Sequence, residues 1–172
     1  MNASETLISR NDAFAAERFS PELRMMPALR TIVIGCVDPR VDPGDVLGAA
    51  PGDVAVVRNV GGRITPSVVE ELVMLRKVTQ AAGGDLGPGW ELVVLQHTDC
   101  GITRLAGETE LLAGFFGVDA DRLHEHSVSD PHAAVLHDLA VLRAEPRLAG
   151  AHVSGLVYDV ATGRVERVAE SA

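Results

Sequence analysis

The chain contains only two cysteines, and each lies just beyond an apolar run, close to other side chains with metal or acid–base chemistry. These residues are Cys36, Asp38 and Arg40 after the first run, and His97 and Cys100 after the second. Two thiolates and one imidazole form a soft donor set that favours zinc. The short spacer between His97 and Cys100 allows one tight turn to present both donors to a single ion. We therefore predict a zinc site built from Cys36, His97 and Cys100.

Three protein ligands leave one tetrahedral position for water, which is typical of catalytic rather than structural zinc. Zinc lowers the pKa of its bound water and yields a hydroxide nucleophile near neutral pH. Two thiolates cancel the charge of the dication, so this water should be less acidic than at a site with three histidines. We expect activity to rise on the alkaline side of neutrality, and a flat rate between roughly pH 6 and 9 would contradict this.

Asp38 has two possible roles at such a site. It could accept a hydrogen bond from the zinc hydroxide and orient the nucleophile, or it could become the fourth ligand and close the site. Arg40 would lie on the same side of an extended segment, and its planar fork suits a bidentate pair with a carboxylate. An ion pair between the two would hold Asp38 off the metal, so losing Arg40 should favour the closed, inactive form.

Alternating strands and helices along the chain predict an α/β fold with a mostly parallel central sheet flanked by helices. Short β-branched runs at 31–36 and 54–59 indicate strands covered on both faces. Further strands are predicted at 91–96 and 152–159, helices at about 5–19, 65–82 and 131–143, and a C-terminal hairpin with an antiparallel edge strand at 164–168. Sites in parallel sheets lie at the carboxyl ends of strands, which places Cys36 and His97 at one edge.

Length and composition limit the remaining possibilities. At 172 residues the chain suits a single domain over residues 1–172, with residues 1–29 forming a helix and an arm that could cover another subunit. No apolar stretch reaches the roughly 20 residues of a membrane span, and no secretion signal is evident. A net charge of −9 disfavours nucleic acid and anionic membranes as partners. Two reduced cysteines favour a cytoplasmic location.

The two segments match the pattern of the β-class carbonic anhydrases, which is C-x-D-x-R followed by H-x-x-C-G. Here these motifs are Cys36–Arg40 and His97–Gly101. Arg58-Asn59-Val60-Gly61 and the tail Gly155–Gly163 extend the similarity, and the length resembles that of compact bacterial members. The paired motifs are specific, whereas Arg-Asn-x-Gly alone would be weak.

The resemblance implies reversible hydration of CO2 to bicarbonate through a zinc-bound hydroxide. It implies Zn2+ held by Cys36, His97 and Cys100, with Asp38 and Arg40 as the catalytic pair and Asp38 as fourth ligand in a closed state. It also implies a homodimer, possibly a tetramer. One departure is Pro39 between the paired residues, where the family usually has Ser or Ala; its fixed φ could constrain the pair or remove a hydrogen bond.

Two other functions remain compatible with these motifs. The same fold and zinc hydroxide can hydrolyse carbonyl sulfide or carbon disulfide, and a non-catalytic zinc-binding protein could retain the ligands. His124, His126 and His132 cluster in a polar stretch and could relay protons, although solvated surface histidines explain them better. The apolar segment 107–117 predicts a short helix over the site or at a dimer contact.

Overall fold

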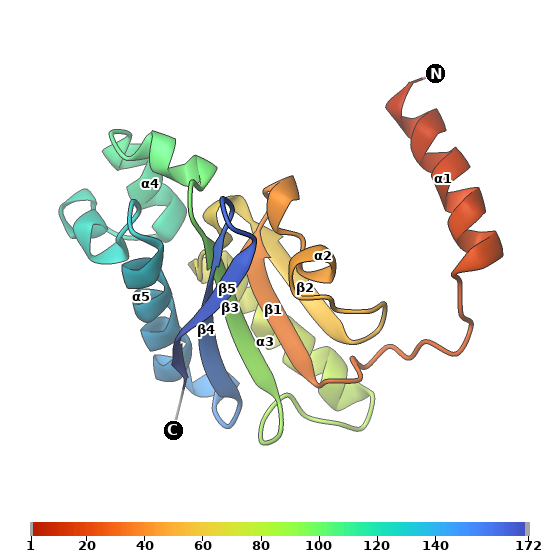
Figure 1. Cartoon of the computed structure of the whole chain (residues 1–172). Helices are drawn as coiled ribbons and strands as arrows, with labels where there is room; N and C mark the ends of the chain where they lie inside the picture. The colour runs from red at the N-terminus through yellow and green to blue at the C-terminus, as the bar shows by residue number, and fades with distance from the viewer. Residues whose placement is uncertain (1, 171–172) are drawn as a thin grey trace.

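A computed structural model describes residues 2–170 and has an α/β fold around a five-stranded sheet (Figure 1). The sheet order is β2-β1-β3-β4-β5; the first four strands are parallel and β5 is antiparallel to β4. The strands are β1 Thr31–Cys36, β2 Val54–Asn59, β3 Glu91–His97, β4 His152–Asp159 and β5 Arg164–Glu170. The predicted parallel sheet with an antiparallel C-terminal edge strand is therefore confirmed.

The helices connect and flank these strands. They are α1 Ala3–Glu17, α2 Pro43–Val46, α3 Pro66–Ala81, α4 Thr109–Phe116 and α5 Pro131–Ala144. The predicted start of α3 is confirmed, because the Thr65 hydroxyl accepts a hydrogen bond from the Val68 N–H at 3.4 Å and Pro66 occupies the first helical position. Over the described part of the chain, every helix is too short or too polar to cross a bilayer.

The core lies mainly on one face of the sheet. Ile34 and Val94, from β1 and β3, are fully buried in the cluster that contains Leu72 of α3 and Leu139 of α5. Alternate residues such as Val33 face the other side, beside the shorter segment around α2. Because β1 and β3 are buried on both faces, they contain nearly continuous apolar runs, as parallel strands require.

β2 differs from the prediction that it is covered on both faces. It forms the edge of the sheet, Val57 is its one buried residue, and 44% of Val56 is exposed. The apolar pattern of this strand alone could not distinguish an interior strand from an edge strand with exposed apolar residues.

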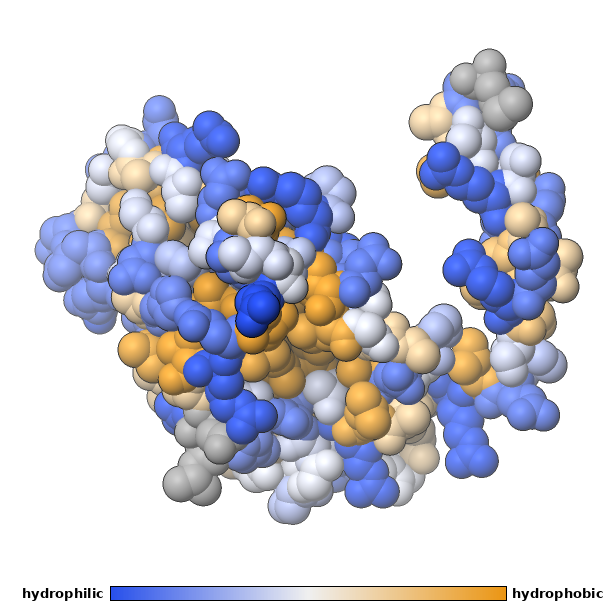
Figure 2. Space-filling view, in the orientation of Figure 1, coloured by the Kyte–Doolittle hydropathy of each residue, from blue (hydrophilic) through white to orange (hydrophobic). Residues whose placement is uncertain are grey.

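α1 extends away from the rest of the molecule (Figures 1 and 2). A capping box starts the helix: Asn2 accepts from the Glu5 N–H, and the Glu5 carboxylate accepts from the Asn2 N–H, each at 2.9 Å. No residue within α1 is buried, and Leu7 and Ile8 are more than 60% exposed. Figure 2 also shows apolar side chains gathered over the middle of the body on this face.

Candidate metal centre

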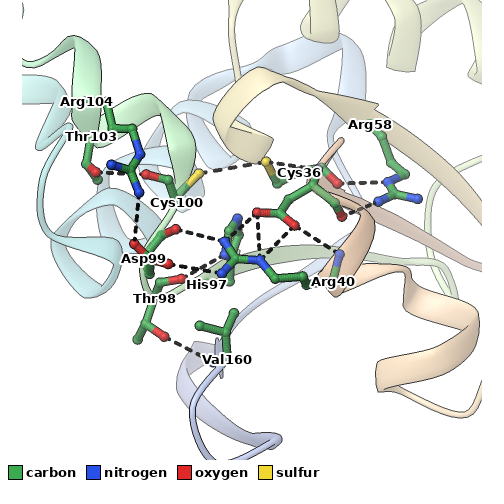
Figure 3. Close-up of polar contacts among 11 residues, drawn as sticks. Cys36, Arg40, Arg58, His97, Thr98, Asp99, Cys100, Thr103, Arg104 and Val160 are labelled. Atoms are coloured by element: carbon green, nitrogen blue, oxygen red, sulfur yellow. Dashed lines mark hydrogen bonds and ion pairs between the residues drawn. The ribbon is translucent and has the colours of Figure 1, made fainter.

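Parallel pairing brings the predicted ligands together. β1 and β3 pair from Thr31 opposite Glu91 to Gly35 opposite Leu95, so Cys36 and His97 leave the sheet at the same edge. The turn after β3 then brings Cys100 back toward Cys36, and their sulfurs lie 3.7 Å apart (Figure 3). The ligand atoms of Cys36, His97 and Cys100 all lie within 4.8 Å of one another, and all three residues are buried.

His97 presents one ring nitrogen to this group. Its Nδ1 lies 2.9 Å from the Thr98 carbonyl oxygen, so Nδ1 carries the proton and donates to that oxygen. Its Nε2 is buried and has no hydrogen-bond partner within residues 2–170. A buried nitrogen without a partner is costly unless something binds it, and an outer hydrogen bond through the other nitrogen is typical of metal-ligating histidines.

The two thiols form an electrostatically coupled pair. The hydrogen bond with Cys100 lowers the pKa of Cys36 to about 4, whereas the same contact and then burial raise the pKa of Cys100. One proton is thus shared between two sulfurs, and a dication could replace it because thiolates are the metal-binding form. Two sulfurs and one nitrogen fit zinc and would hold it with one coordination position left for solvent.

The segment after β1 places Asp38 and Arg40 beside these donors. The Asp38 N–H donates to the Cys36 sulfur at 3.4 Å, and the Asp38 carboxylate accepts the Arg40 N–H at 2.9 Å, which starts the 3-10 turn Pro39–Val41. Pro39 is the first residue of that turn, where a backbone N–H has no partner within the helix. Pro39 therefore fits the local fold, and its fixed φ helps to form the turn.

Arg40 forms a bidentate ion pair with Asp38. Its Nε lies 3.0 Å from Asp38 Oδ1, and its Nη2 lies 2.7 Å from Oδ2. These hydrogen bonds lower the pKa of Asp38 to about 2 and keep the carboxylate ionised. Within the described residues, Asp38 does not belong to the group of possible metal ligands. Asp38 and Arg40 thus form the expected ion pair, and the Asp38 carboxylate is engaged by Arg40.

Arg58, at the end of β2, stabilises this segment from the other side. It donates to the Cys36 carbonyl and the Asp38 carbonyl, each at 2.8 Å (Figure 3). Its Nη1 also lies 2.6 Å from the Asp42 carboxylate. Asp42 also caps α2 by accepting the Gly44 N–H. Asp42 is thus a structural residue at the start of a helix.

Gly62 packs directly against the backbone of the first ligand. A Cβ there would lie 2.7 Å from the Cys36 nitrogen and 2.8 Å from the Gly35 carbonyl carbon, and the residue has a φ of +61°. Any side chain would therefore collide with rigid backbone in a conformation that favours glycine. The Gly62 carbonyl also accepts a hydrogen bond from buried Gln96 at 2.7 Å.

The three histidines singled out in the sequence do not form a group at the site. His124 and His132 are exposed, and His132 pairs with Glu166 on β5. His126 is 7% exposed and stacks on Phe116 of α4, with ring centroids 4.5 Å apart. The predicted apolar helix around Phe116 is confirmed.

A buried ion pair near the site was missed from the sequence. Arg63 and Asp138 have side chains that are each 1% exposed, and Arg63 Nε lies 2.8 Å from Asp138 Oδ2. Arg63 also donates to the His126 carbonyl at 2.6 Å and lies over the Phe116 ring. The partners are 75 residues apart, so no local motif connects them.

Comparisons with known proteins agree on one family. Residues 31–116, half of the chain, match the family model described as Carbonic anhydrase. Beta-carbonic anhydrase 1 of Mycobacterium tuberculosis is 27% identical over 98% of this chain and 99% of its own length. The crystal structure of carbonic anhydrase from Streptococcus mutans has a TM-score of 0.74 and 32% identity, covering 98% of this chain and 99% of that one. Carbon disulfide hydrolase from an Acidianus species is 26% identical over 80% of this chain and 76% of that protein.

Proposed function

This chain belongs to the β-carbonic anhydrase family of lyases, and we propose that it hydrates carbon dioxide reversibly to bicarbonate and a proton. We assign Cys36, His97 and Cys100 as ligands of a catalytic zinc ion, and Asp38 and Arg40 as the catalytic pair. The observation that carries the proposal is the ion-paired Asp38 beside three buried donors that approach one point. Thiolate ligands need a reducing compartment, so the proposal includes a cytoplasmic location.

Each proposed residue has a defined task. Zinc, when bound, makes water acidic enough to act as a nucleophile near neutral pH. Asp38 accepts a hydrogen bond from the attacking water and orients it, because Arg40 keeps the carboxylate ionised. Arg40 holds Asp38 in place through its bidentate contact. The Cys36 and Cys100 thiolates neutralise the charge of a dication, so we expect the rate to rise above neutral pH.

Stopped-flow CO2 hydration on zinc-loaded protein tests this assignment. The wild type is compared across pH with Cys36→Ser, which removes a ligand, and Asp38→Asn, which removes the orienting carboxylate. Glu125→Gln is a control, because Glu125 is exposed and pairs with neighbouring Arg122, three residues away and outside the proposed site. We expect normal rates for the control and large losses for the other two. A wild type no faster than both site variants would eliminate the enzymatic assignment.

The second candidate function is hydrolysis of carbon disulfide or carbonyl sulfide. The similarity to the Acidianus carbon disulfide hydrolase favours it, since the three proposed ligands could serve either reaction. Parallel assays with CO2 and carbonyl sulfide separate the two. A much higher kcat/KM for the sulfur substrate would replace CO2 as the proposed substrate. A zinc-loaded protein inactive on both would support a non-catalytic role.

We also propose that residues 1–172 form one domain and that the arm of residues 1–29 packs on a second subunit to make a homodimer. Two observations support this arrangement: α1 buries none of its residues, and β2 leaves the sheet edge unpaired within the described chain. Sedimentation of a variant lacking residues 2–18 should give a smaller assembly than the full chain. If the truncated variant formed assemblies with the same number of chains as the full-length protein, the role of the arm would be refuted. A full-length assembly of four chains would indicate a tetramer.

A further inference from the structure

We propose that Asp99 is a positioning residue that holds Arg40 from the side opposite Asp38 and so keeps Asp38 off the metal. The inference rests on the proposed roles of Asp38 and Arg40. Asp99 lies in the turn between His97 and Cys100, so it connects the second ligand motif to the first across the sheet edge (Figure 3).

The guanidinium of Arg40 is held by two carboxylates at once. Its Nε and Nη2 donate to Asp38, at 3.0 Å to Oδ1 and 2.7 Å to Oδ2. Its Nη1 donates to Asp99 Oδ2 at 3.0 Å, and its Nη2 also donates to the Asp99 carbonyl at 3.0 Å. Asp38 thus binds one edge of the fork and Asp99 the other. Asp99 is the only residue outside the 36–42 segment that these contacts connect to Arg40 within the described chain.

This second contact matters because Arg40 is not fixed by burial. Its side chain is 47% exposed, and a long exposed side chain keeps many rotamers unless several bonds hold it. Asp38 is only 14% exposed and lies beside the donors. If Arg40 moved into solvent, Asp38 would lose its bidentate partner and could turn toward the cation instead.

The backbone of Asp99 is shaped for this contact. Its φ is +51°, a left-handed conformation that aspartate and asparagine tolerate better than most residues. In this turn the carbonyl and the carboxylate of Asp99 both reach the same guanidinium. The other carboxylate oxygen, Oδ1, lies 3.8 Å from Arg104, so Asp99 itself has a cation on its outer side.

Two variants remove the carboxylate with different effects on the backbone. Asp99→Asn keeps the tolerance for positive φ, and Asp99→Gly relaxes the turn further while both retain the carbonyl. The matched control is Asp85→Asn, which removes a carboxylate from an exposed bidentate pair with Arg76 that lies outside the site. Cobalt(II) replaces zinc, and thiocyanate is titrated while the visible spectrum reports whether the ion has an exchangeable position.

We expect both Asp99 variants to bind thiocyanate about 10-fold more weakly than the wild type, because apparent affinity falls with the fraction of open sites. We expect kcat/KM for CO2 to fall by a similar factor, about 10-fold, as for other residues that orient a metal site. The Asp85 variant should match the wild type in both measurements. Unchanged thiocyanate affinity in either Asp99 variant would overturn the inference. Loss of cobalt from either variant would also overturn it, since Asp99 would then be part of the ligand turn itself.

The cobalt measurement separates this inference from the proposed function. If the wild type failed to hydrate CO2 while the Asp99 variants still closed the site, only the reaction would be wrong. If the wild type were active and both variants stayed open, only the role of Asp99 would be wrong.

Discussion

Replacing Asp138 with Asn should strongly destabilise the protein. The change preserves the shape of the side chain but leaves the Arg63 guanidinium without its anion in the interior. Both side chains are 1% exposed, and Arg63 loses the charged partner of its Nε and Nη2 hydrogen bonds, at 2.8 and 3.2 Å. Arginine cannot give up its proton in a protein, so the charge cannot be removed by titration.

The expected loss follows from burial. Removing one partner of a buried ion pair typically costs about 3–5 kcal/mol, because the other charge stays desolvated. The bond from Arg63 to the His126 carbonyl survives and keeps the guanidinium in the interior. A loss of about 3–5 kcal/mol is a large part of the roughly 5–15 kcal/mol that stabilises a typical domain.

Urea unfolding of zinc-loaded protein at one fixed protein concentration measures this loss. Glu125→Gln is the matched control, because it breaks an exposed pair with Arg122 and should cost less than about 1 kcal/mol. Arg63→Met combined with Asp138→Leu should recover most of the loss, although the His126 carbonyl then lacks its donor, which leaves about 1–2 kcal/mol. If Asp138→Asn cost no more than the control, the reasoning about desolvation would be wrong.

Three further outcomes follow from the same contacts. Gly62→Ala should cost more than about 2 kcal/mol and lower zinc occupancy, whereas Gly48→Ala, at a φ of +66° with open space around it, should cost only about 1–2 kcal/mol in urea unfolding. Burial, followed by nearby His137 and Arg63, lowers the pKa of His126 to about 4, so the unfolded chain takes up this proton first and stability falls as pH drops from about 6.5 toward 4. His126→Phe should remove up to about 2 kcal/mol of that acid loss, measured by unfolding at pH 7.5 and 4.5. Chelating the metal should lower the melting temperature by about 10 °C in calorimetry, and a Cys36→Ser protein should show little further change.

The sequence predicted the sheet well because its parallel strands are buried and its helices carry strong end signals. The run at Thr31–Cys36 and the start of a helix near residue 65 are local features, and the structure has both where they were expected. The edge position of β2 was missed, because an interior strand and an edge strand can have the same apolar sequence pattern. The placement of Val56 depends on tertiary structure, which periodicity does not encode.

Some residues of the site could likewise be placed from the sequence, and others could not. Cys36 and His97 could be placed together because the carboxyl ends of neighbouring parallel strands share an edge. The contact of Asp99 with Arg40 could not be predicted, since it depends on a positive φ and on one arginine rotamer. The burial of His126 could not be predicted for a related reason. His126 turns inward to stack on Phe116, while neighbouring His124 stays in solvent.

The strand order explains why this edge of the sheet holds its groups so firmly. β1 lies between β2 and β3, so the chain leaves β1 toward one neighbour and later returns on the other side. Each neighbouring strand contributes hydrogen bonds to the segment after β1. Arg58 of β2 donates to the carbonyls of Cys36 and Asp38. Asp99, just beyond β3, accepts from Arg40. A segment held from both sides keeps its carboxylate fixed although much of Arg40 faces solvent. The same residues on an edge strand would have a neighbour on one side only, and the Asp38–Arg40 pair would lose one of these two contacts.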